Sequence, residues 1–373
     1  MKIAFICGSL EPGKDGVGDY TRKLAEELCK KGHECLAIAL NDKFIKQCAD
    51  FKDSTLNLTL TRIPFTFPEK ERLKILEAVV YAFEADWISL QFVSFSFQPK
   101  GIISTPFIRV FKKISGDIKC HIMFHEIWVG IEQKAHLKHI LWGRIQKARI
   151  VSLMKSVKFL LITTSNRLYY LKLSQVGIKP FILRLFSNIP IIKSTKVSLK
   201  PTSEVLIVFG GIHHGAPIED FAKEVSDFSK KSGRAFELII AGRSGSEQVK
   251  WQAAWERYQM PVKISGEIEE SGISELLQSS TIGISTTPIN LADKSGAVAA
   301  MRLHQLPIIS VARDWLPRGH SVNNAIAPDD IFDYRGGNFE TIYSNLQTSL
   351  GNNSVEEISK ILIESMEETI WPV

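Results

Sequence analysis

The chain has 373 residues, of which 45% are hydrophobic and 23% charged, and a formal net charge of +6. This composition is ordinary for a globular protein, and the length favours two domains over a single core. The mild positive charge fits anionic ligands or a membrane surface as well as nucleic acid.

The cysteines argue against a secreted, disulfide-bonded protein. The chain has five, Cys7, Cys29, Cys35, Cys48 and Cys120, and none forms a CxxC pair. An odd number at this spacing fits neither a disulfide framework nor a zinc site and predicts a reducing compartment. The first apolar run is short and no run reaches the ~20 apolar residues of a membrane helix. We therefore expect a cytoplasmic protein, which a membrane surface could hold at its cytoplasmic face.

Strand and helix patterns alternate in the first half of the chain. Strands are predicted at Lys2–Cys7, Cys35–Leu40, Trp87–Phe92, His121–Phe124 and Phe159–Thr163, with a loop over Gly8–Gly18 and a helix over Asp19–Lys31. Short apolar runs separated by helices indicate parallel βαβ units. Residues 187–201 have no clear period and contain two prolines, which predicts a linker.

The same alternation starts again after this linker. The pattern predicts strands at Val205–Phe209, Phe236–Ala241, Val262–Ile264, Ile282–Ser285 and Ile308–Val311, and helices at Ile218–Lys231, Ile273–Leu277 and Val355–Thr369. Two α/β halves of similar size predict two Rossmann-like domains facing a cleft. Ligands of such sheets bind at the carboxyl ends of the strands.

Three loops of the second half are candidates for binding a phosphate. Lys294, Ser295 and Gly296 open a helix after the strand Ile282–Ser285, where free N–H groups and a positive dipole end suit an anion. Gly210 and Gly211 follow the strand Val205–Phe209, in a turn that His213 and His214 continue. Arg243 follows the strand Phe236–Ala241, and an arginine suits bidentate contact with a diphosphate.

Two segments of the first half are further candidates. Gly16, Val17 and Gly18 precede a helix, and glycines there let a phosphate or sugar approach the backbone; the alternative is a flexible turn. His125 and Glu126 follow the strand His121–Phe124 and fit a general base or a partner of a substrate hydroxyl. For His125 the alternative is a histidine that satisfies nearby backbone groups.

Residues 134–158 combine cations with apolar side chains. The cations are Lys134, Lys138, Arg144, Lys147, Arg149, Lys155 and Lys158. The pattern predicts a basic amphipathic helix, which fits an anionic membrane surface. The alternative is a helix that packs on the core with a solvated basic face.

The ordered motifs resemble the retaining glycosyltransferases of family 4, which have the GT-B fold. They are MKIAFICGSLEPGKDGVGDYTRKLAEELCKKGHE, FHEIW, VFGGI, LIIAGR, ISGEI, ELLQSSTIGIST and KSGAVAAMRLHQLPII. The resemblance implies an acceptor-binding domain over residues 1–190, a nucleotide-sugar-binding domain over residues 191–354, and a terminal segment, 355–373, that packs back on the first domain. It also implies that His125 lies in the active site.

The chain departs from the pattern of that family at several positions. Ala292 and Ala300 stand where the family has a pair of glutamates, and the family's two cations fall near Gly211 and His214. Lys294 and Arg243 are then the expected replacements. These departures leave open a non-catalytic subunit of a glycan-synthesis complex or a nucleotide-sugar epimerase.

The leading hypothesis is transfer of a sugar from a UDP- or GDP-linked donor, with retention of configuration. The acceptor is a glycan, a lipid-linked molecule or a small molecule, and we expect no nucleic-acid partner. No cofactor and no metal are expected. Asp329 and Asp330 follow the last core strand and are expected to cap the next segment.

Overall fold

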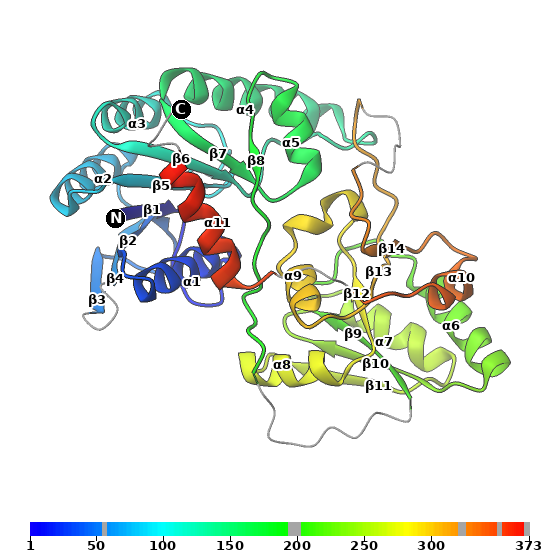
Figure 1. Ribbon diagram of the computed structural model, residues 1–373. Helices are drawn as coiled ribbons and strands as arrows, with labels where there is room; N and C mark the ends of the chain where they lie inside the picture. Colours follow the sequence, from blue (N-terminus) through cyan, green and yellow to red (C-terminus); the bar gives the residue numbers. More distant parts are fainter. Residues whose placement is uncertain (54–57, 193–202, 320–325, 349–352, 369–373) are drawn as a thin grey trace. The chain divides into compact units, whose positions relative to one another are not determined.

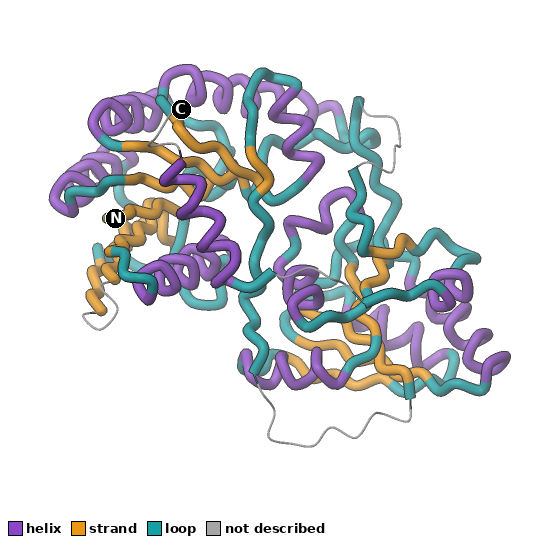
Figure 2. The backbone as a smooth tube through the Cα atoms, in the orientation of Figure 1, coloured by secondary structure: helices purple, strands orange, loops and turns teal. Residues whose placement is uncertain are grey.

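The protein is an α/β chain that divides into two compact units in a computed structural model (Figure 1). The structure describes residues 1–53, 58–192, 203–319, 326–348 and 353–368. Unit 1 comprises Met1–Arg184 and Val355–Val373, and unit 2 comprises Leu185–Ser354. Most of the predicted linker 187–201 lies outside the described residues. Each unit has its own sheet with helices on both faces (Figure 2), which confirms the predicted pair of Rossmann-like α/β domains.

Unit 1 is built on an eight-stranded sheet in the order β3-β4-β2-β1-β5-β6-β7-β8. The strands are β1 (Lys2–Cys7), β2 (Glu34–Asp42), β3 (Ala49–Asp53), β4 (Leu58–Pro64), β5 (Trp87–Phe92), β6 (Lys119–Phe124), β7 (Phe159–Thr164) and β8 (Phe181–Ile182). All pairs are parallel except β3 with β4. Central strands such as β5 are buried on both faces, which explains their continuous apolar sequences.

The helices of unit 1 cover both faces of this sheet. They are α1 (Gly16–Lys30), α2 (Glu69–Phe83), α3 (Thr105–Asp117), α4 (Leu137–Ser156), α5 (Arg167–Ser174) and α11 (Val355–Glu368). Helices α1 and α11 pack together on one face, and α2, α3 and α4 lie on the other (Figure 1). Lys31 ties α11 to the end of α1, since its Nζ donates to Glu356 O at 2.6 Å and to Ser359 Oγ at 2.7 Å.

Unit 2 has a six-stranded parallel sheet in the order β11-β10-β9-β12-β13-β14. The strands are β9 (Glu204–Phe209), β10 (Phe236–Ala241), β11 (Val262–Gly266), β12 (Ile282–Ser285), β13 (Ile308–Ser310) and β14 (Ile331–Asp333). The helices are α6 (Ile218–Ser232), α7 (Gln248–Arg257), α8 (Glu270–Ser279), η1 (Ile289–Lys294), α9 (Gly296–Leu303) and α10 (Phe339–Ser344). The order of the strands reverses direction between β9 and β12.

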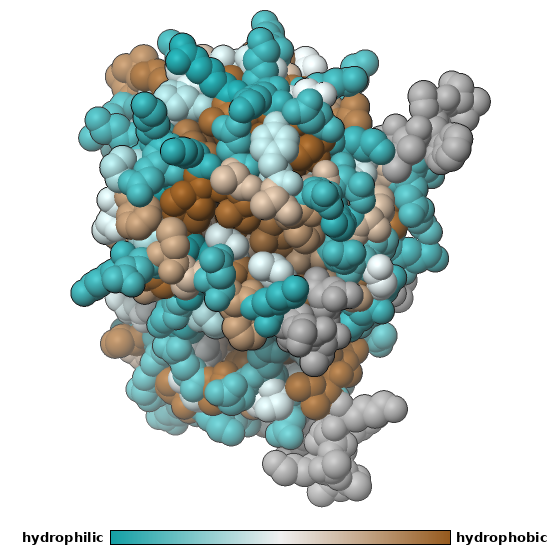
Figure 3. Space-filling model, turned by 90° about the vertical axis from the view of Figure 1, so that its left-hand side faces the viewer, coloured by the Kyte–Doolittle hydropathy of each residue, from teal (hydrophilic) through white to brown (hydrophobic). Residues whose placement is uncertain are grey.

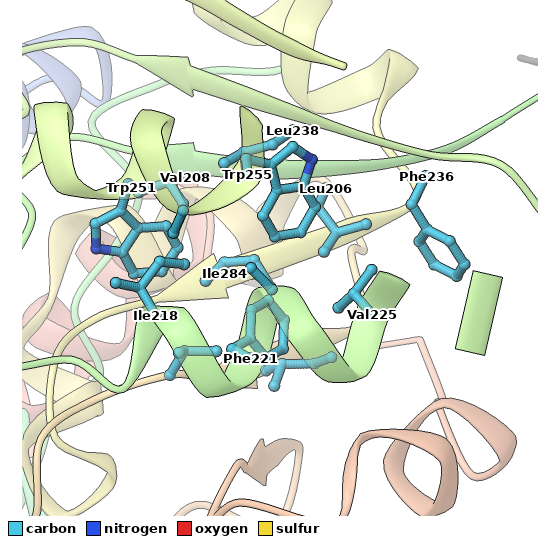
Figure 4. Packing of buried hydrophobic residues seen from close by; sticks show 14 of the residues in the cluster. Leu206, Val208, Ile218, Phe221, Val225, Phe236, Leu238, Trp251, Trp255 and Ile284 are labelled. Atoms are coloured by element: carbon cyan, nitrogen blue, oxygen red, sulfur yellow. The ribbon is translucent and has the colours of Figure 1, made fainter. Parts of the chain in front are cut away.

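The core of unit 2 is rich in large aromatic side chains on one face of the sheet. Trp251 and Trp255 of α7 are fully buried, and they pack with Phe221 of α6 against Val208 and Ile284 of the central strands (Figure 4). Side chains of this size each bury about 150–250 Å². Helices α8 and α9 close the opposite face through a second apolar cluster. The central strands β9 and β12 are therefore held from both sides.

Two predicted helix starts are wrong in part. The pattern predicts a loop over Gly8–Gly18, but α1 begins at Gly16, because the Asp15 carboxylate accepts hydrogen bonds from Val17 N at 2.9 Å and Gly18 N at 2.8 Å and so caps the helix. Lys294 was expected to open a helix with Ser295 and Gly296, but it is the last residue of the 3-10 helix η1, and α9 begins at Gly296 with Ser295 as its N-cap. Among the helices that the structure describes, none combines the length and hydropathy needed to cross a bilayer.

Candidate functional site

The first candidate site lies at the carboxyl edge of the unit 2 sheet, where the strand order reverses between β9 and β12. Three loops follow the central strands there, beginning at Gly210 after β9, at Gly242 after β10 and at Thr286 after β12. Ligands of open α/β sheets bind at this type of reversal because the loops diverge and leave a crevice. The sequence-predicted residues of unit 2 thus belong to neighbouring loops.

Glycines allow the backbones of two of these loops to come close. Gly210 and Gly242 have positive φ values of 84° and 85°, and a Cβ on Gly242 would lie 3.3 Å from Gly210 N. Thr286 Oγ1 accepts a hydrogen bond from His213 N at 2.9 Å, which ties the glycine turn to the end of β12. A Cβ on Gly210 or on Gly211 would meet its nearest neighbour only at 4.0 Å, so the backbone of the turn is open on that side.

The beginning of α9 supplies backbone donors at this edge. Ser295 is the N-cap, and its hydroxyl accepts from Val298 N at 3.4 Å. The N–H groups of Gly296 and Ala297 belong to the first turn, where no intrahelical acceptor exists. An ideal Cβ on Gly210 would lie 4.0 Å from Ala297 Cβ, so the glycine turn and the start of α9 are neighbours. Together they form a candidate anion site.

Cations gather around His213 at the same place. Its pKa lies below the ordinary value, first because the imidazole is partly buried and then because of the positive charges of Lys294 and Arg313. Arg313 follows β13, and its side chain lies against Gly215, since an added Cβ there would be 3.4 Å from Arg313 Cβ. Arg313 was not predicted, although its position in the loop that follows the core strand β13 could have identified it.

Arg243 and His214 occupy less favourable positions than the sequence suggests. Arg243 is exposed and its Nε donates to Glu267 Oε2 at 2.8 Å. His214 is 83% exposed and lies 3.0 Å from Glu247 Oε1. Glu267 therefore already pairs with Arg243, and Glu247 lies beside His214. Arg313 joins Lys294 as a second cation near His213, and the role of Arg243 stays a prediction.

The acidic residues near α9 serve the structure of unit 2. Arg302 is buried, and its guanidinium binds Asp330 through Nε and Nη2, both at 2.7 Å, and Asp293 through Nη1 at 2.9 Å. Asp330 therefore pairs with Arg302, and the capping role expected for Asp329 and Asp330 stays a prediction. Asp293 is engaged in the same way, and Ala300, where a glutamate is expected from the resemblance, is fully buried.

The second candidate site surrounds His125 at the carboxyl end of β6 in unit 1. His125 is buried, its backbone N–H donates to Phe92 O at 3.0 Å, and the ring of Tyr20 approaches its edge at 4.9 Å between centroids. Glu126 is the next residue and is half-buried. Strand β6 is the direct neighbour of β5, and the order of the unit 1 sheet reverses between β1 and β5.

A chain of buried hydrogen bonds runs from His125 across three strands. His125 Nε2 lies 2.8 Å from Gln91 Oε1, and Gln91 Nε2 donates to Ser89 Oγ at 2.7 Å. Ser89 Oγ lies 2.8 Å from His121 Nδ1, and His121 Nε2 lies 2.8 Å from Thr163 Oγ1. We name this set the His125 chain. Polar residues such as Gln91 inside otherwise apolar strands are the sequence signal for this chain of hydrogen bonds.

The His125 chain fixes the state of the imidazole. Because Gln91 Oε1 can only accept, His125 Nε2 must carry the proton, and Nδ1 remains an acceptor. Burial lowers the pKa of His125 to about 3, so the ring is neutral at neutral pH. Within the described residues Nδ1 has no hydrogen-bond partner. Nδ1 is therefore the acceptor nitrogen of the ring.

The glycines at the start of α1 have a structural role. A Cβ on Gly18 would come within 2.3 Å of Ser9 O, so the close packing of α1 on that loop requires a glycine. The N–H groups of Val17 and Gly18 already donate to Asp15. In this conformation they are not available to a phosphate. A Cβ on Gly16 would meet nothing within 4 Å, so the space beside this glycine is open.

The residues that the structure describes contain no group of three or more His, Cys, Asp or Glu side chains that could hold a metal ion.

Comparisons with known proteins identify the fold but not the family. No protein-family model matches the chain, and no curated protein matches its sequence. Among solved structures, a glycosyltransferase from Rickettsia africae is similar at a TM-score of 0.59 and 13% identity, covering 100% of this chain and 99% of that one. HepE from Anabaena, solved with UDP and glucose, gives a TM-score of 0.57 and 14% identity over 99% and 100% of the two chains.

An epimerase is also among the similar structures. UDP-GlcNAc 2-epimerase from Neisseria meningitidis, bound to UDP-GlcNAc, gives a TM-score of 0.50 and 11% identity over 99% of this chain and 100% of that one. At these identities the similarity establishes the fold, which is GT-B, over the full length of the chain. Activity has to be argued from the sites themselves.

Proposed function

We propose that the protein is a glycosyltransferase that uses a nucleoside diphosphate-sugar. The observation that carries the proposal is the pair of cations, Lys294 and Arg313, around His213 beside the start of α9 and at the strand reversal of unit 2. A diphosphate needs several donors and positive charges held in fixed places, which this edge provides. The UDP and UDP-sugar in similar structures support this assignment.

The donor site is assigned to unit 2. The diphosphate contacts Lys294, Arg313 and the N–H groups of Gly296 and Ala297, while Gly210 and Gly211 let the ligand lie against backbone. These groups stabilise the charge that develops on the leaving diphosphate, and this is the main contribution that a protein can make in such a transfer. Because the positive charge comes from side chains and helix N–H groups, we propose that turnover needs no divalent metal. The family 4 resemblance supports retention of configuration.

The acceptor site is assigned to the carboxyl edge of unit 1, around His125. An imidazole with a pKa of about 3 is too weak a base to remove a proton from a sugar hydroxyl at neutral pH. We therefore give His125 a hydrogen-bonding role, in which Nδ1 accepts from a hydroxyl and orients it. Glu126, the neighbouring half-buried carboxylate, is the candidate base.

Binding measurements test the donor site directly. Isothermal titration of UDP, GDP and UDP-glucose gives the wild-type affinities. Lys294→Ala and Arg313→Ala should each weaken the nucleotide that binds by roughly tenfold or more, because each removes a charge-assisted contact. Lys263→Ala is the matched control, since Lys263 is an exposed lysine on β11 of the same sheet. Equal affinity for all four proteins would refute the donor site.

The epimerase alternative is separated by isotope incorporation. Incubation with UDP-sugars in D2O leaves the donor unlabelled when a transferase or a non-catalytic protein acts on it. An epimerase that removes a proton from the sugar puts deuterium at the carbon it inverts. Release of UDP without label supports transfer, label in the sugar supports epimerisation, and tight binding without either reaction supports a non-catalytic subunit.

A further inference from the structure

The N-terminal half of α4 exposes a row of large apolar side chains. Leu137, Leu141 and Ile145 are 77%, 57% and 52% exposed. Their spacing of four residues places them on one side of the helix, along about 12 Å of its axis. Hydrophobic side chains reach the surface elsewhere too, as on the face in Figure 3, so exposure alone marks no site. Three in helical register form a pattern, and we call them the α4 stripe.

The opposite side of α4 holds this orientation firmly. Trp142 Nε1 donates to Lys100 O at 2.8 Å, and buried Gln146 accepts from Val129 N at 2.9 Å. A Cβ on Gly143 would collide with the Val129 carbonyl, so the helix lies as close to that loop as a glycine permits. The helix cannot rotate to bury the stripe. The sequence left two alternatives for this segment, a helix on a membrane surface and a helix packed on the core with a solvated basic face. Helix α4 packs on unit 1 through one side, and its other side exposes apolar residues as well as basic ones.

The charged residues of α4 have a single sign. Lys138, Arg144 and Lys155 are exposed, and none of them forms an ion pair within the part of the chain that the structure describes. At about 100° per residue, Arg144 and Lys138 flank the stripe on its two sides. The whole helix, Leu137–Ser156, contains no aspartate or glutamate. The exposed side of α4 is therefore apolar along its middle and cationic at its margins.

We propose that α4 lies on an anionic membrane surface, with Leu137, Leu141 and Ile145 in the boundary between headgroups and acyl chains. A stable protein interface needs about 800 Å² and 20–30 residues on each side, far more than one row of three side chains. A bilayer accepts such a narrow row, and anionic headgroups complement Lys138, Arg144 and Lys155. Membrane binding through α4 is independent of the proposed donor and acceptor sites, and it can be tested without a substrate for either site.

The test is sedimentation of the full chain with vesicles. Wild-type protein should bind vesicles that contain about one-third phosphatidylglycerol, bind neutral phosphatidylcholine vesicles much more weakly, and dissociate at high salt. The triple substitution Leu137→Ser, Leu141→Ser and Ile145→Ser should weaken binding by roughly tenfold or more, because the apolar term is lost. Circular dichroism and thermal melting verify that the variant is folded.

A second variant and a control complete the design. Lys138→Gln, Arg144→Gln and Lys155→Gln together should abolish the preference for anionic lipid, and this variant decides the matter if the first one does not fold. Val249→Ser is the control, because Val249 is 68% exposed on α7 of unit 2. Binding that is absent, or equal for all proteins, overturns the proposal. So does a wild-type dimer in solution that the Ser variant dissociates, since the stripe would then be a self-association surface.

Discussion

The His125 chain makes a specific prediction about acid stability in unit 1. His121 and His125 are both buried, and burial is the main reason that the pKa of each falls from 6.5 to about 3. In the unfolded chain both imidazoles recover their ordinary pKa. Lowering the pH from about 7.5 to about 5 therefore protonates two histidines in the unfolded state and neither in the folded state.

The magnitude follows from linkage. The penalty is absent above the unfolded pKa of 6.5, grows as the pH falls, and stops growing below the folded pKa of about 3. At about pH 5 each histidine costs about 2 kcal/mol, and the two together about 4 kcal/mol. That is a large part of the 5–15 kcal/mol that a domain usually has. Unit 1 should therefore lose stability in mild acid, well before its carboxylates are protonated.

Substitutions separate this titration from loss of packing. His121→Gln keeps hydrogen-bonding groups but cannot titrate, so its loss of stability between the two pH values should be about 2 kcal/mol in place of about 4. Thr163→Val removes the hydroxyl that His121 contacts but no titrating group. It should lower the stability at both pH values and leave the difference near 4 kcal/mol.

The assay must report unit 1 alone, because a chain with two units need not unfold in one step. Hydrogen exchange, followed by mass spectrometry on peptides from β5 and β6 and corrected for intrinsic rates, gives the local free energy of opening. If His121→Gln loses as much stability as the wild type, the buried imidazoles do not control the acid response and the reasoning is wrong.

Three other predictions concern the two sites and their support. Gly18→Ala should destabilise unit 1 by more than 1 kcal/mol in urea because of its clash with Ser9 O, while Gly16→Ala, which meets no neighbour, should be neutral. Arg302→Met should lower the melting temperature of unit 2, since two carboxylates lose their cation at a cost of about 3 kcal/mol, and an unchanged melt would contradict it. Donor turnover should survive exhaustive EDTA treatment; loss of turnover that magnesium restores would show that a metal supplies charge in place of Lys294.

The sequence predicts the strands well because their signal is local. Runs such as Trp87–Phe92 are continuous and apolar, as buried parallel strands require. The predicted start of α1 was wrong, although the sequence contains a signal for the true start, because Asp15 is a good N-cap residue. The glycines at positions 16 and 18 suggested a loop instead. A glycine often indicates a turn because its backbone can adopt conformations that other residues avoid. At Gly18 the absence of a side chain instead allows α1 to pack closely against Ser9.

The sites were harder to predict than the fold because they depend on strand order. Lys294 and Arg313 lie in loops after different strands, and only the order β9-β12-β13 makes these loops neighbours. Pairing partners are equally invisible in the sequence, which is why Arg243 looked available although Glu267 binds it. Gln91 could have been noticed as a polar residue inside an apolar strand. Its link to His125 needed the register of β5 and β6.

The discontinuity of unit 1 has a consequence for biosynthesis. Met1–Arg184 emerges from the ribosome first, but α11 is made only after the whole of unit 2. At 5–20 residues per second the intervening Leu185–Ser354 takes on the order of ten to thirty seconds. During that time the side of α1 that receives the apolar residues of α11 stays open. Nascent unit 1 is thus incomplete for many folding times, and a chaperone that shields α1 would have its greatest effect in that interval.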